Sequence, residues 1–316
     1  MERAGFEPAT SGLQTRGRPF PPVPAYRHGY DVVQFEFCAH ASWMKRVPAG
    51  ARAVYSAHNV EIDYLSARGR SSQPGPGMLR RVEELERLAV ESSDLVVTCT
   101  EADASRLAEI YGAAEAVVVP NGCDDELLGL DRARLRDPAR ASLGIRADEL
   151  CLLFVGGPAH HNREAVTYLE RELIPRLGGE TTLLVAGRCG GRPGRLARGG
   201  ATTLRLGFVK DLRPLFAAAD VAVNPARYGS GSSLKLVEYI AARVPVVTTW
   251  VGMRGFERLR DHVLVSELSD FANAVHSAGR IPPLDDEALE ELRWSVGARR
   301  LYDAYLRPPG REEVLG

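Results

Sequence analysis

The chain has 316 residues, of which 45% are hydrophobic and 26% are charged, and its formal net charge is −1. This length allows two ordinary domains, and the near-neutral balance argues against a nucleic-acid partner held by a basic surface. No apolar run approaches the roughly 20 residues that cross a bilayer, and the five scattered cysteines contain no CxxC pair. Such cysteine usage suits a reducing compartment, so we expect a soluble, cytoplasmic protein.

The amino-terminal segment, residues 1–28, is rich in Pro, Gly and Arg and shows neither a helical nor a strand period. It also lacks the pattern of a signal peptide. Its stretch GFEPATSGLQTR resembles the peptide produced when a reading frame runs through a tRNA gene. Two interpretations stay open for this segment: a spurious leader that is no part of the fold, or a disordered Pro-rich leader.

From residue 29 to residue 130, short strands alternate with helices. We expect strands over 30–37, 52–57, 94–99 and 116–120, and helices over 79–89 and from Thr100 to Gly112. The near-continuous apolar run 94–99 is typical of a parallel strand covered on both faces. In the second helix, Thr100 stands three residues before Asp103 in a capping-box-like relation, and Gly112 supplies the helix end.

Residues 121–149 show no strong period, so we expect an irregular connection between two domains there. The alternation restarts beyond it, with strands expected over 150–157, 182–187, 203–209, 221–225 and 245–250, and helices over 163–177, 211–220, 234–243, 269–279 and 286–306. Two blocks of alternating strands and helices predict an α/β protein with two parallel sheets. Trp294 on the last helix is expected to pack in a core or against the first domain.

Ligands of parallel sheets bind beyond the carboxyl ends of the strands, which directs attention to the loops 156–163 and 226–233. In the second loop, Gly229 and Gly231 allow positive φ angles and a close approach of the backbone. Ser232 and Ser233 follow where the first free amides of the next helix point outward. A helix start favours an anion such as a diphosphate.

Lys235 and Glu238 lie in the first turns of that helix. A lysine there is unfavourable to the helix itself, which makes an anionic ligand a better reason for it. Glu238 projects on the same side three residues later, where its carboxylate would accept hydrogen bonds from a vicinal diol such as a ribose. An ordinary surface ion pair, worth about 0.3 kcal/mol, is the alternative, and the pattern alone leaves both open.

The first loop repeats this logic in the segment FVGGPAHHN, residues 154–162. Two glycines follow a strand, Asn162 is expected to be the N-cap of the next helix, and Arg163 lies in its first turn. Two loops suited to phosphate in one domain strengthen the prediction of a phosphate-bearing ligand. His160 and His161 are adjacent rather than spaced as metal ligands, so no metal is expected.

The segment NPARYGSGSSLKLVEYIAARVPVVTTWVGMRGF, residues 224–256, resembles the donor-site signature of retaining GT-B glycosyltransferases of the family-4 type, GSGxxLKxLEYxAxGxPVV. Further segments follow in the family order: AHNVE (57–61), SDLVVTCTEAD (93–103), VVPNGCD (118–124) and GFVKDLRPLFAAADVAVNP (207–225). The resemblance covers about residues 30–306. It implies two Rossmann-like parallel-sheet domains, the amino-terminal one incomplete because its first strands are missing.

The resemblance also implies a domain plan and roles for residues. Residues 29–130 would form the partial acceptor-side domain, 131–284 the nucleotide-sugar-binding domain, and 285–316 a helix that packs back towards the first domain. Glu238 would hold the ribose, while Lys235 and Arg163 would neutralise the diphosphate. The remaining implied contacts are the amides from Gly231 to Ser233 with the diphosphate, Gly157 in the first loop, the turn Phe208–Val209–Lys210 with the base, and His58 with the transferred sugar.

Two departures from the family pattern concern the sugar. Many members carry a glutamate where this chain has Ser230, and an arginine where it has Gly157. The implied function is metal-independent transfer, with retained configuration, of a sugar from a nucleotide-diphosphate sugar to a hydroxyl of a glycan, a lipid-linked acceptor or a small molecule. No cofactor and no nucleic acid take part, and a peripheral membrane contact is allowed.

Two alternatives stay open. One is a truncated, non-catalytic remnant that only binds nucleotide, which the missing acceptor half favours. The other is a nucleotide-sugar epimerase of GT-B shape. That enzyme would need acid and base carboxylates between the domains, and Ser230 at the glutamate position argues against it.

Overall fold

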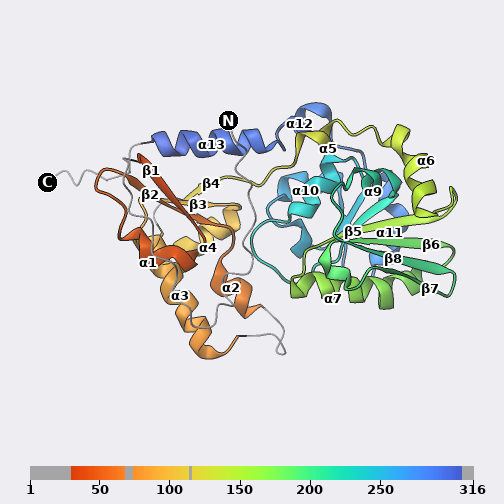
Figure 1. Ribbon diagram of the computed structural model, residues 1–316, viewed down its shortest axis with the longest axis horizontal. Coiled ribbons are helices and arrows are strands. Elements are labelled where there is room, and N and C mark those ends of the chain that lie inside the picture. The colour runs from red at the N-terminus through yellow and green to blue at the C-terminus, as the bar shows by residue number, and fades with distance from the viewer. Residues whose placement is uncertain (1–29, 68–73, 114–115, 308–316) are drawn as a thin grey trace.

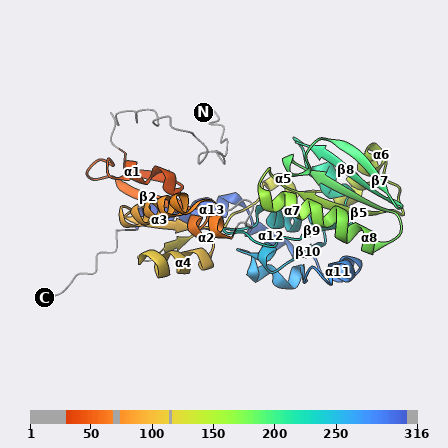
Figure 2. The same ribbon diagram turned by 90° about the horizontal axis from the view of Figure 1, so that it is seen from below.

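The computed structural model describes residues 30–67, 74–113 and 116–307; the expectations for residues 1–28 lie outside them. The chain forms two lobes side by side (Figures 1 and 2), each built on its own sheet. The predicted α/β architecture with two parallel-sheet domains is confirmed. Among the described residues, no helix combines the length and the apolar character needed to cross a membrane.

The first lobe is built on a four-stranded parallel sheet in the order β1-β2-β3-β4. Its strands are β1 Val32–Glu36, β2 Arg52–Ala57, β3 Leu95–Thr98 and β4 Ala116–Val118. One face packs against α1 Ala41–Met44, α2 Glu61–Ser66, α3 Pro76–Glu91 and α4 Glu101–Tyr111. All four residues of β3 are buried, as expected for a strand covered on both sides.

The ends of α4 follow from local chemistry. The Thr100 side chain accepts a hydrogen bond from the amide of Asp103 at 2.9 Å, which satisfies one of the free donors of the first turn. Gly112 ends the helix in the left-handed conformation, with φ of 63°. Both predicted helix ends are confirmed.

The last helix, α13 Trp294–Leu306, lies across the other face of the first sheet (Figure 1). Ala304 is buried against Val54 of β2, and Arg52 donates hydrogen bonds to the carbonyl oxygens of Ala304 at 2.8 Å and Tyr305 at 3.1 Å. Trp294 is 43% exposed, so the expectation that it packs in a core is wrong. It stands at the first position of the helix, whereas the buried face is carried by residues one to three turns later.

The second lobe is built on a seven-stranded sheet in the order β11-β10-β9-β5-β6-β8-β7. Its strands are β5 Leu150–Val155, β6 Thr181–Ala186, β7 Gly194–Arg198, β8 Ala201–Gly207, β9 Val221–Asn224, β10 Val246–Thr248 and β11 Leu264–Val265. Only β7 is antiparallel. The sequence did not predict it, because this edge strand is rich in Gly and Arg and carries no apolar alternation.

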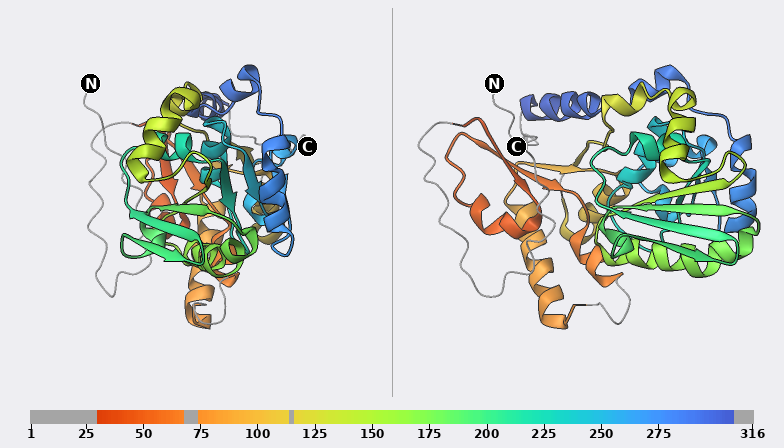
Figure 3. Two further views of the ribbon diagram at one scale, coloured as in Figure 1. Left: turned by 90° about the vertical axis from the view of Figure 1, so that its right-hand side faces the viewer. Right: turned by 45° about the vertical axis from the view of Figure 1, so that its right-hand side comes forward.

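Helices cover both faces of this sheet (Figure 3). One face packs against α5 Asp125–Leu128, α6 Arg132–Leu143, α9 Arg213–Ala218, α10 Leu234–Ala241 and the segment of α12 Asp286–Glu290. The other face packs against α7 His160–Tyr168, its π-helical continuation Leu169–Leu173, α8 Ile174–Leu177 and α11 Phe271–Ser277. Leu153 of β5 faces the first set and Leu152 the second, as strand alternation requires.

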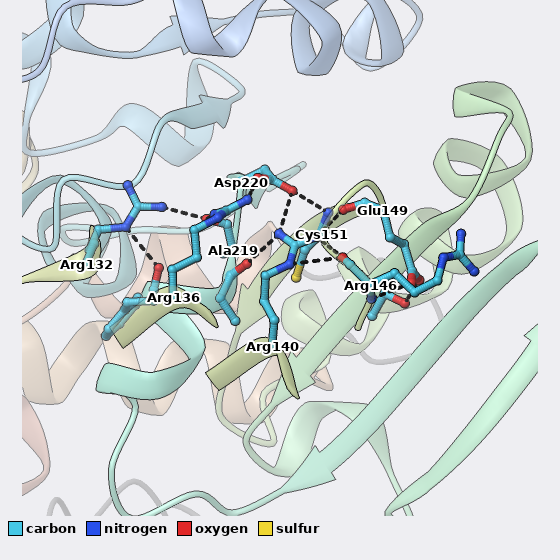
Figure 4. A network of polar contacts seen from close by, with 11 residues as sticks. Arg132, Arg136, Arg140, Arg146, Glu149, Cys151, Ala219 and Asp220 are labelled. Carbon is cyan, nitrogen blue, oxygen red and sulfur yellow. Dashed lines mark hydrogen bonds and ion pairs between the residues drawn. The ribbon is translucent and has the colours of Figure 1, made fainter. Parts of the chain in front are cut away.

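The connection 121–149 is helical, so the expectation of an irregular segment is wrong. Its helix α6 packs Leu135, Ala139 and Leu143 against the core, and its buried Arg140 adds polar contacts (Figure 4). Arg140 is 2% exposed and donates to the carbonyl oxygen of Arg146 at 2.8 Å and to the carboxylate of Asp220 at 3.2 Å. The Asp220 carboxylate also accepts the amide of Cys151 in β5 at 2.8 Å. The short apolar stripe is interrupted by arginines and by Pro138, so the sequence did not reveal this helix.

Candidate functional site

The two loops singled out above meet at one edge of the second sheet. β5 and β9 are parallel neighbours, with Leu152 opposite Val221 and Leu153 opposite Ala222. The loops that leave their carboxyl ends therefore lie next to each other. The first leads into α7 and the second into α10, so two helix starts converge where a ligand of such a sheet binds.

Lys235 joins the two loops. Its Nζ donates a hydrogen bond to Asn162 Oδ1 at 2.6 Å and lies 4.6 Å from the centre of the Phe154 ring. Burial lowers the pKa of Lys235 to about 8. The Lys235 ammonium is hydrogen-bonded to Asn162, and Glu238 acts on it only through its charge, so the expectation of an ordinary surface ion pair is wrong. A half-buried ammonium with a neutral partner is prepared for an anion.

Asn162 is a site residue that the sequence placed incorrectly. The N-cap of α7 is Ala159 and the helix starts at His160, so the predicted start at 163 and the capping role of Asn162 are wrong. Asn162 lies inside the first turn, 6% exposed, and its Nδ2 donates to the Gly157 carbonyl oxygen at 3.3 Å. Its Oδ1 is thereby turned to Lys235. Arg163 follows in the same turn and is exposed.

Glu238 is half-buried on the first turns of α10. Burial and the nearby Asp124 carboxylate raise its pKa to about 7, although Lys235 acts in the opposite direction. Close by in the glycine loop, the Ser230 hydroxyl oxygen is buried without a hydrogen-bond partner among the described residues. Buried polar groups normally have partners, so this loop carries a hydrogen-bonding capacity that a hydroxyl-bearing ligand would use.

The glycine loop touches the first lobe directly. Gly231 has φ of 70°, and a Cβ atom there would overlap the carbonyl oxygen of His58 and lie 2.6 Å from Asn59 Oδ1. The Gly231 amide acts to lower the pKa of the Asp103 carboxyl, and this carboxylate also lies 3.7 Å from the guanidinium of Arg254. The lobes are thus closed on each other at this loop.

The amides expected to bind a diphosphate are partly engaged in this closed arrangement. Besides the Gly231 amide, the Ser233 amide donates to the Arg254 carbonyl oxygen at 3.2 Å. The Ser232 hydroxyl accepts a hydrogen bond from Asn121 Nδ2 at 2.6 Å. Of the three predicted amides, that of Ser233 has a backbone hydrogen-bond partner within the described part of the chain. The Gly231 amide lies within the influence of the Asp103 carboxylate of the first lobe, where an anion was expected.

Replacing Gly231 by alanine is expected to separate the lobes. The φ of 70° is unfavourable for any residue with a Cβ, by about 1–2 kcal/mol, and the added methyl group would overlap the His58 carbonyl. Small-angle scattering should show a larger radius of gyration for Gly231→Ala than for the parent. Gly279→Ala, where nothing lies within 4 Å, is the matched control. Equal radii for all three proteins would contradict the closed contact.

His58 lies on the first-lobe side of this contact, at the end of β2. Its Nε2 is 2.6 Å from Glu36 Oε2, and its ring stacks on Phe37 with the centroids 4.6 Å apart. The sequence identified His58 through the family resemblance but missed Glu36. A signal was present, because Glu36 ends the strand adjacent to the one that precedes His58.

The remaining predicted residues lie on the same edge of the second sheet. Gly157 has open space around its Cα. Phe208 follows β8 and is 78% exposed, Val209 packs partly against the core, and Lys210 is exposed. Contacts of this turn with a base stay a prediction.

A cavity of about 410 Å³ lies elsewhere, beside α6. It is lined by Arg132, Arg136 and Arg243, and none of its lining residues belongs to the two loops. The Arg132 guanidinium donates to the carbonyl oxygen of Phe216 at 3.1 Å and to those of Ala219 and Arg243 at 2.6 Å. These hydrogen bonds connect the start of α6 to the ends of α9 and α10. They give Arg132 a structural role that requires no ligand.

The raised pKa of Glu238 predicts a pH-dependent cost in stability. Between pH 4.5 and about 7 the folded state binds more protons than the unfolded state, so stability falls as the pH rises through this window. Above pH 7 the full cost of about 1–3 kcal/mol is present. Glu238→Gln should therefore be more stable than the parent at pH 8 but not at pH 4.5. Urea unfolding at both values measures this, with the exposed Glu267→Gln as control; an equal change at both pH values would refute the assignment.

Family models match both lobes. A model described as Glycosyltransferase Family 4 matches residues 19–127, and one described as Glycosyl transferases group 1 matches residues 149–278. The two matches correspond to the two sheets.

Curated relatives give a consistent result. A D-inositol 3-phosphate glycosyltransferase of Actinosynnema mirum is 30% identical over 245 residues, which cover 71% of this chain and 57% of the relative. The D-inositol 3-phosphate glycosyltransferase 2 of Catenulispora acidiphila is 29% identical over 313 residues, 88% of this chain and 71% of the relative. The chain thus spans little more than half the length of the first relative.

Solved structures share the fold. The sucrose-phosphate synthase of Thermosynechococcus elongatus superimposes with a TM-score of 0.65 at 18% identity, covering 88% of this chain and 74% of that one. The HepE protein of Anabaena, in complex with UDP and glucose, gives 0.65 at 16% identity, covering 87% and 77%. Because both lobes match glycosyltransferase models and the two-sheet fold is that of GT-B structures, the chain belongs to the GT-B glycosyltransferases.

Proposed function

We propose that the chain is a retaining, metal-independent glycosyltransferase that moves a sugar from a nucleotide-diphosphate sugar to a hydroxyl acceptor. The observation that carries this proposal is the half-buried ammonium of Lys235, placed between two helix starts by Asn162 and Phe154. The orphaned Ser230 hydroxyl supports it as a partner for a sugar hydroxyl. The UDP complexes of the HepE structures support the donor class.

In the proposed reaction, the bond between the anomeric carbon and the diphosphate oxygen breaks while the acceptor oxygen bonds to the same face of that carbon. The acceptor proton passes to the departing phosphate oxygen. Lys235, Arg163 and the start of α10 would stabilise the negative charge that develops on the diphosphate, an effect worth several kcal/mol in a site without water. Glu238 would accept the ribose hydroxyls, and His58 would face the sugar.

Donor binding requires the closed contact at Gly231 to open. The Gly231 backbone lies against the His58 carbonyl oxygen and near the Asp103 carboxylate in the present arrangement, where a diphosphate would have to enter. Burial raises the pKa of Asp103 above its usual value, so exposure of this carboxylate on opening is favourable. The lobes then close again over the donor, which excludes water from the reacting bond.

Calorimetry with UDP, GDP and ADP on the full chain tests the function. One of the three should bind in the presence of EDTA, and the corresponding nucleotide-glucose should release the nucleotide when sugar or inositol acceptors are added. Binding without release, with acceptors of all classes, would show a nucleotide-binding protein rather than an enzyme. If none of the nucleotides binds, the proposal fails.

The state of the cysteines supports a proposal for the cellular compartment in which the reaction takes place. All five are free and buried among the described residues, which suits a reducing compartment such as the cytoplasm. A peripheral membrane contact is proposed only for the case of a lipid-linked acceptor, and flotation with anionic vesicles measures it.

A further inference from the structure

Glu36 and His58 are brought together by the register of the first sheet. β1 and β2 are parallel, with Glu36 opposite Ser56, so both strands end at the same edge. His58 follows two residues after Ser56. Its Nε2 and Glu36 Oε2 are 2.6 Å apart, and both side chains keep contact with solvent, at 40% and 43% exposure. This edge faces the glycine loop, because the His58 carbonyl oxygen touches Gly231.

Phe37 completes the support of His58. Its ring stacks on the imidazole at 4.6 Å, and its backbone has φ of 68° and ψ of 148°. A bulky residue with positive φ is an outlier that persists only where the surroundings impose it, commonly at functional sites. The strained turn after β1 places the carboxylate and the aromatic ring on two sides of one imidazole.

We propose that Glu36 is a positioning residue that keeps His58 as a cation at the diphosphate-binding glycine loop. This inference rests on the proposed function, because the cation has a purpose only if the loop binds an anionic donor. The closed lobes bring the His58 backbone against Gly231. A positive charge from the first lobe then complements Lys235 from the second.

The electrostatics of the pair agree with this geometry. Contacts with the Cys99 sulfur and with the Glu36 carboxylate raise the pKa of His58 to about 10, although burial opposes the charge. Burial also opposes the charge of Glu36 and so acts to raise its pKa. The hydrogen bond with His58 nevertheless holds the pKa of Glu36 below its usual value. Within the described part of the chain, Glu36 and Cys99 are the titratable groups that face the ring.

The decisive measurement is the titration of His58 by NMR in the full chain, with its resonance identified by its loss in His58→Asn. In the parent, His58 should remain protonated from pH 6 to pH 9. In Glu36→Gln its pKa should fall by about one to three units, because an opposite charge is lost. Glu36→Asp should restore most of the parent value, and the exposed Glu84→Gln on α3 should leave it unchanged.

The functional readout is UDP affinity at pH 6 and pH 9, by calorimetry. From pH 6 to pH 9, the UDP affinity of Glu36→Gln should fall about three- to tenfold more than that of the parent. Titration of Lys235 and Glu238 affects both proteins equally and therefore cancels in this comparison. An unchanged His58 titration in Glu36→Gln overturns the inference, and so does a shifted titration without a change in UDP affinity. If Cys99→Ser alone shifts the titration, the thiol and not Glu36 holds the charge. Failure of UDP, GDP and ADP to bind the parent would instead refute the proposed function.

Discussion

Lys235→Met is expected to weaken UDP binding by about 100-fold. Lys235 is a half-buried cation between the two loops that we propose to contact the diphosphate. Loss of a hydrogen bond to a charged group costs about 1.5–3 kcal/mol, and about 1.4 kcal/mol corresponds to a factor of ten. Methionine keeps a long apolar side chain beside the Phe154 ring while it removes the charge that lies over that ring. Calorimetry with UDP at pH 7 measures the change.

The same substitution should stabilise the folded chain. The pKa of Lys235 falls from 10.5 to about 8, so the folded state binds fewer protons than the unfolded state between these values. The cost of the buried charge, at most about 3 kcal/mol, is complete below pH 8 and is relieved as the pH rises to 10.5. Urea unfolding at pH 7 should show Lys235→Met to be the more stable protein.

Lys45→Met, at an exposed position of the first lobe, is the control for both measurements. A functional residue that weakens the fold is a common feature of binding sites. If Lys235→Met binds UDP as tightly as the parent, Lys235 does not belong to the binding site, whatever the stability of the variant.

Arg140→Met is expected to destabilise the second lobe by about 3–5 kcal/mol, the cost of removing one partner of a buried ion pair. The guanidinium donates to the carbonyl oxygens of Arg146, Glu149 and Ala218 and to the Asp220 carboxylate. Methionine leaves these carbonyls without their donor. Because Asp220 also holds the amide of Cys151, the loss extends to the start of the central strand β5.

Urea unfolding of Arg140→Met at pH 7, followed by far-UV circular dichroism, measures this loss. Arg134→Met is the matched control, because Arg134 is exposed on the same helix. A change below about 1 kcal/mol, the range of an exposed ion pair, would show that the network of Figure 4 contributes little.

The sequence predicted local interactions correctly where both interacting groups lie in the same segment. Thr100 bonds an amide three residues away, and Gly112 needs only its own left-handed φ. The apolar run of β3 was enough to predict that this strand is buried. The strand–loop–helix segments of the second lobe were also predictable, because the order of strands and helices determines at which edge of a parallel sheet the loops lie.

Segments with a weak or interrupted apolar pattern could not be predicted. The short apolar stripe of α6 lies among arginines and beside Pro138, and Arg140 supplies further buried contacts. The edge strand β7 owes its place to pairing with β8 alone. The start of α7 was misplaced because an asparagine near a helix start suits a cap equally well as a tertiary contact; its partner, Lys235, is 73 residues away.

By itself, then, the sequence determined the α/β class, the two sheets, the family and the two loops, since each depends on residue order within one segment. Only the tertiary structure decided which side chains meet: Asn162 with Lys235, Glu36 with His58, and Gly231 with the first lobe. These contacts join residues from different strands and from different lobes. Their distances depend on register and on the closure of the lobes, which no local pattern encodes.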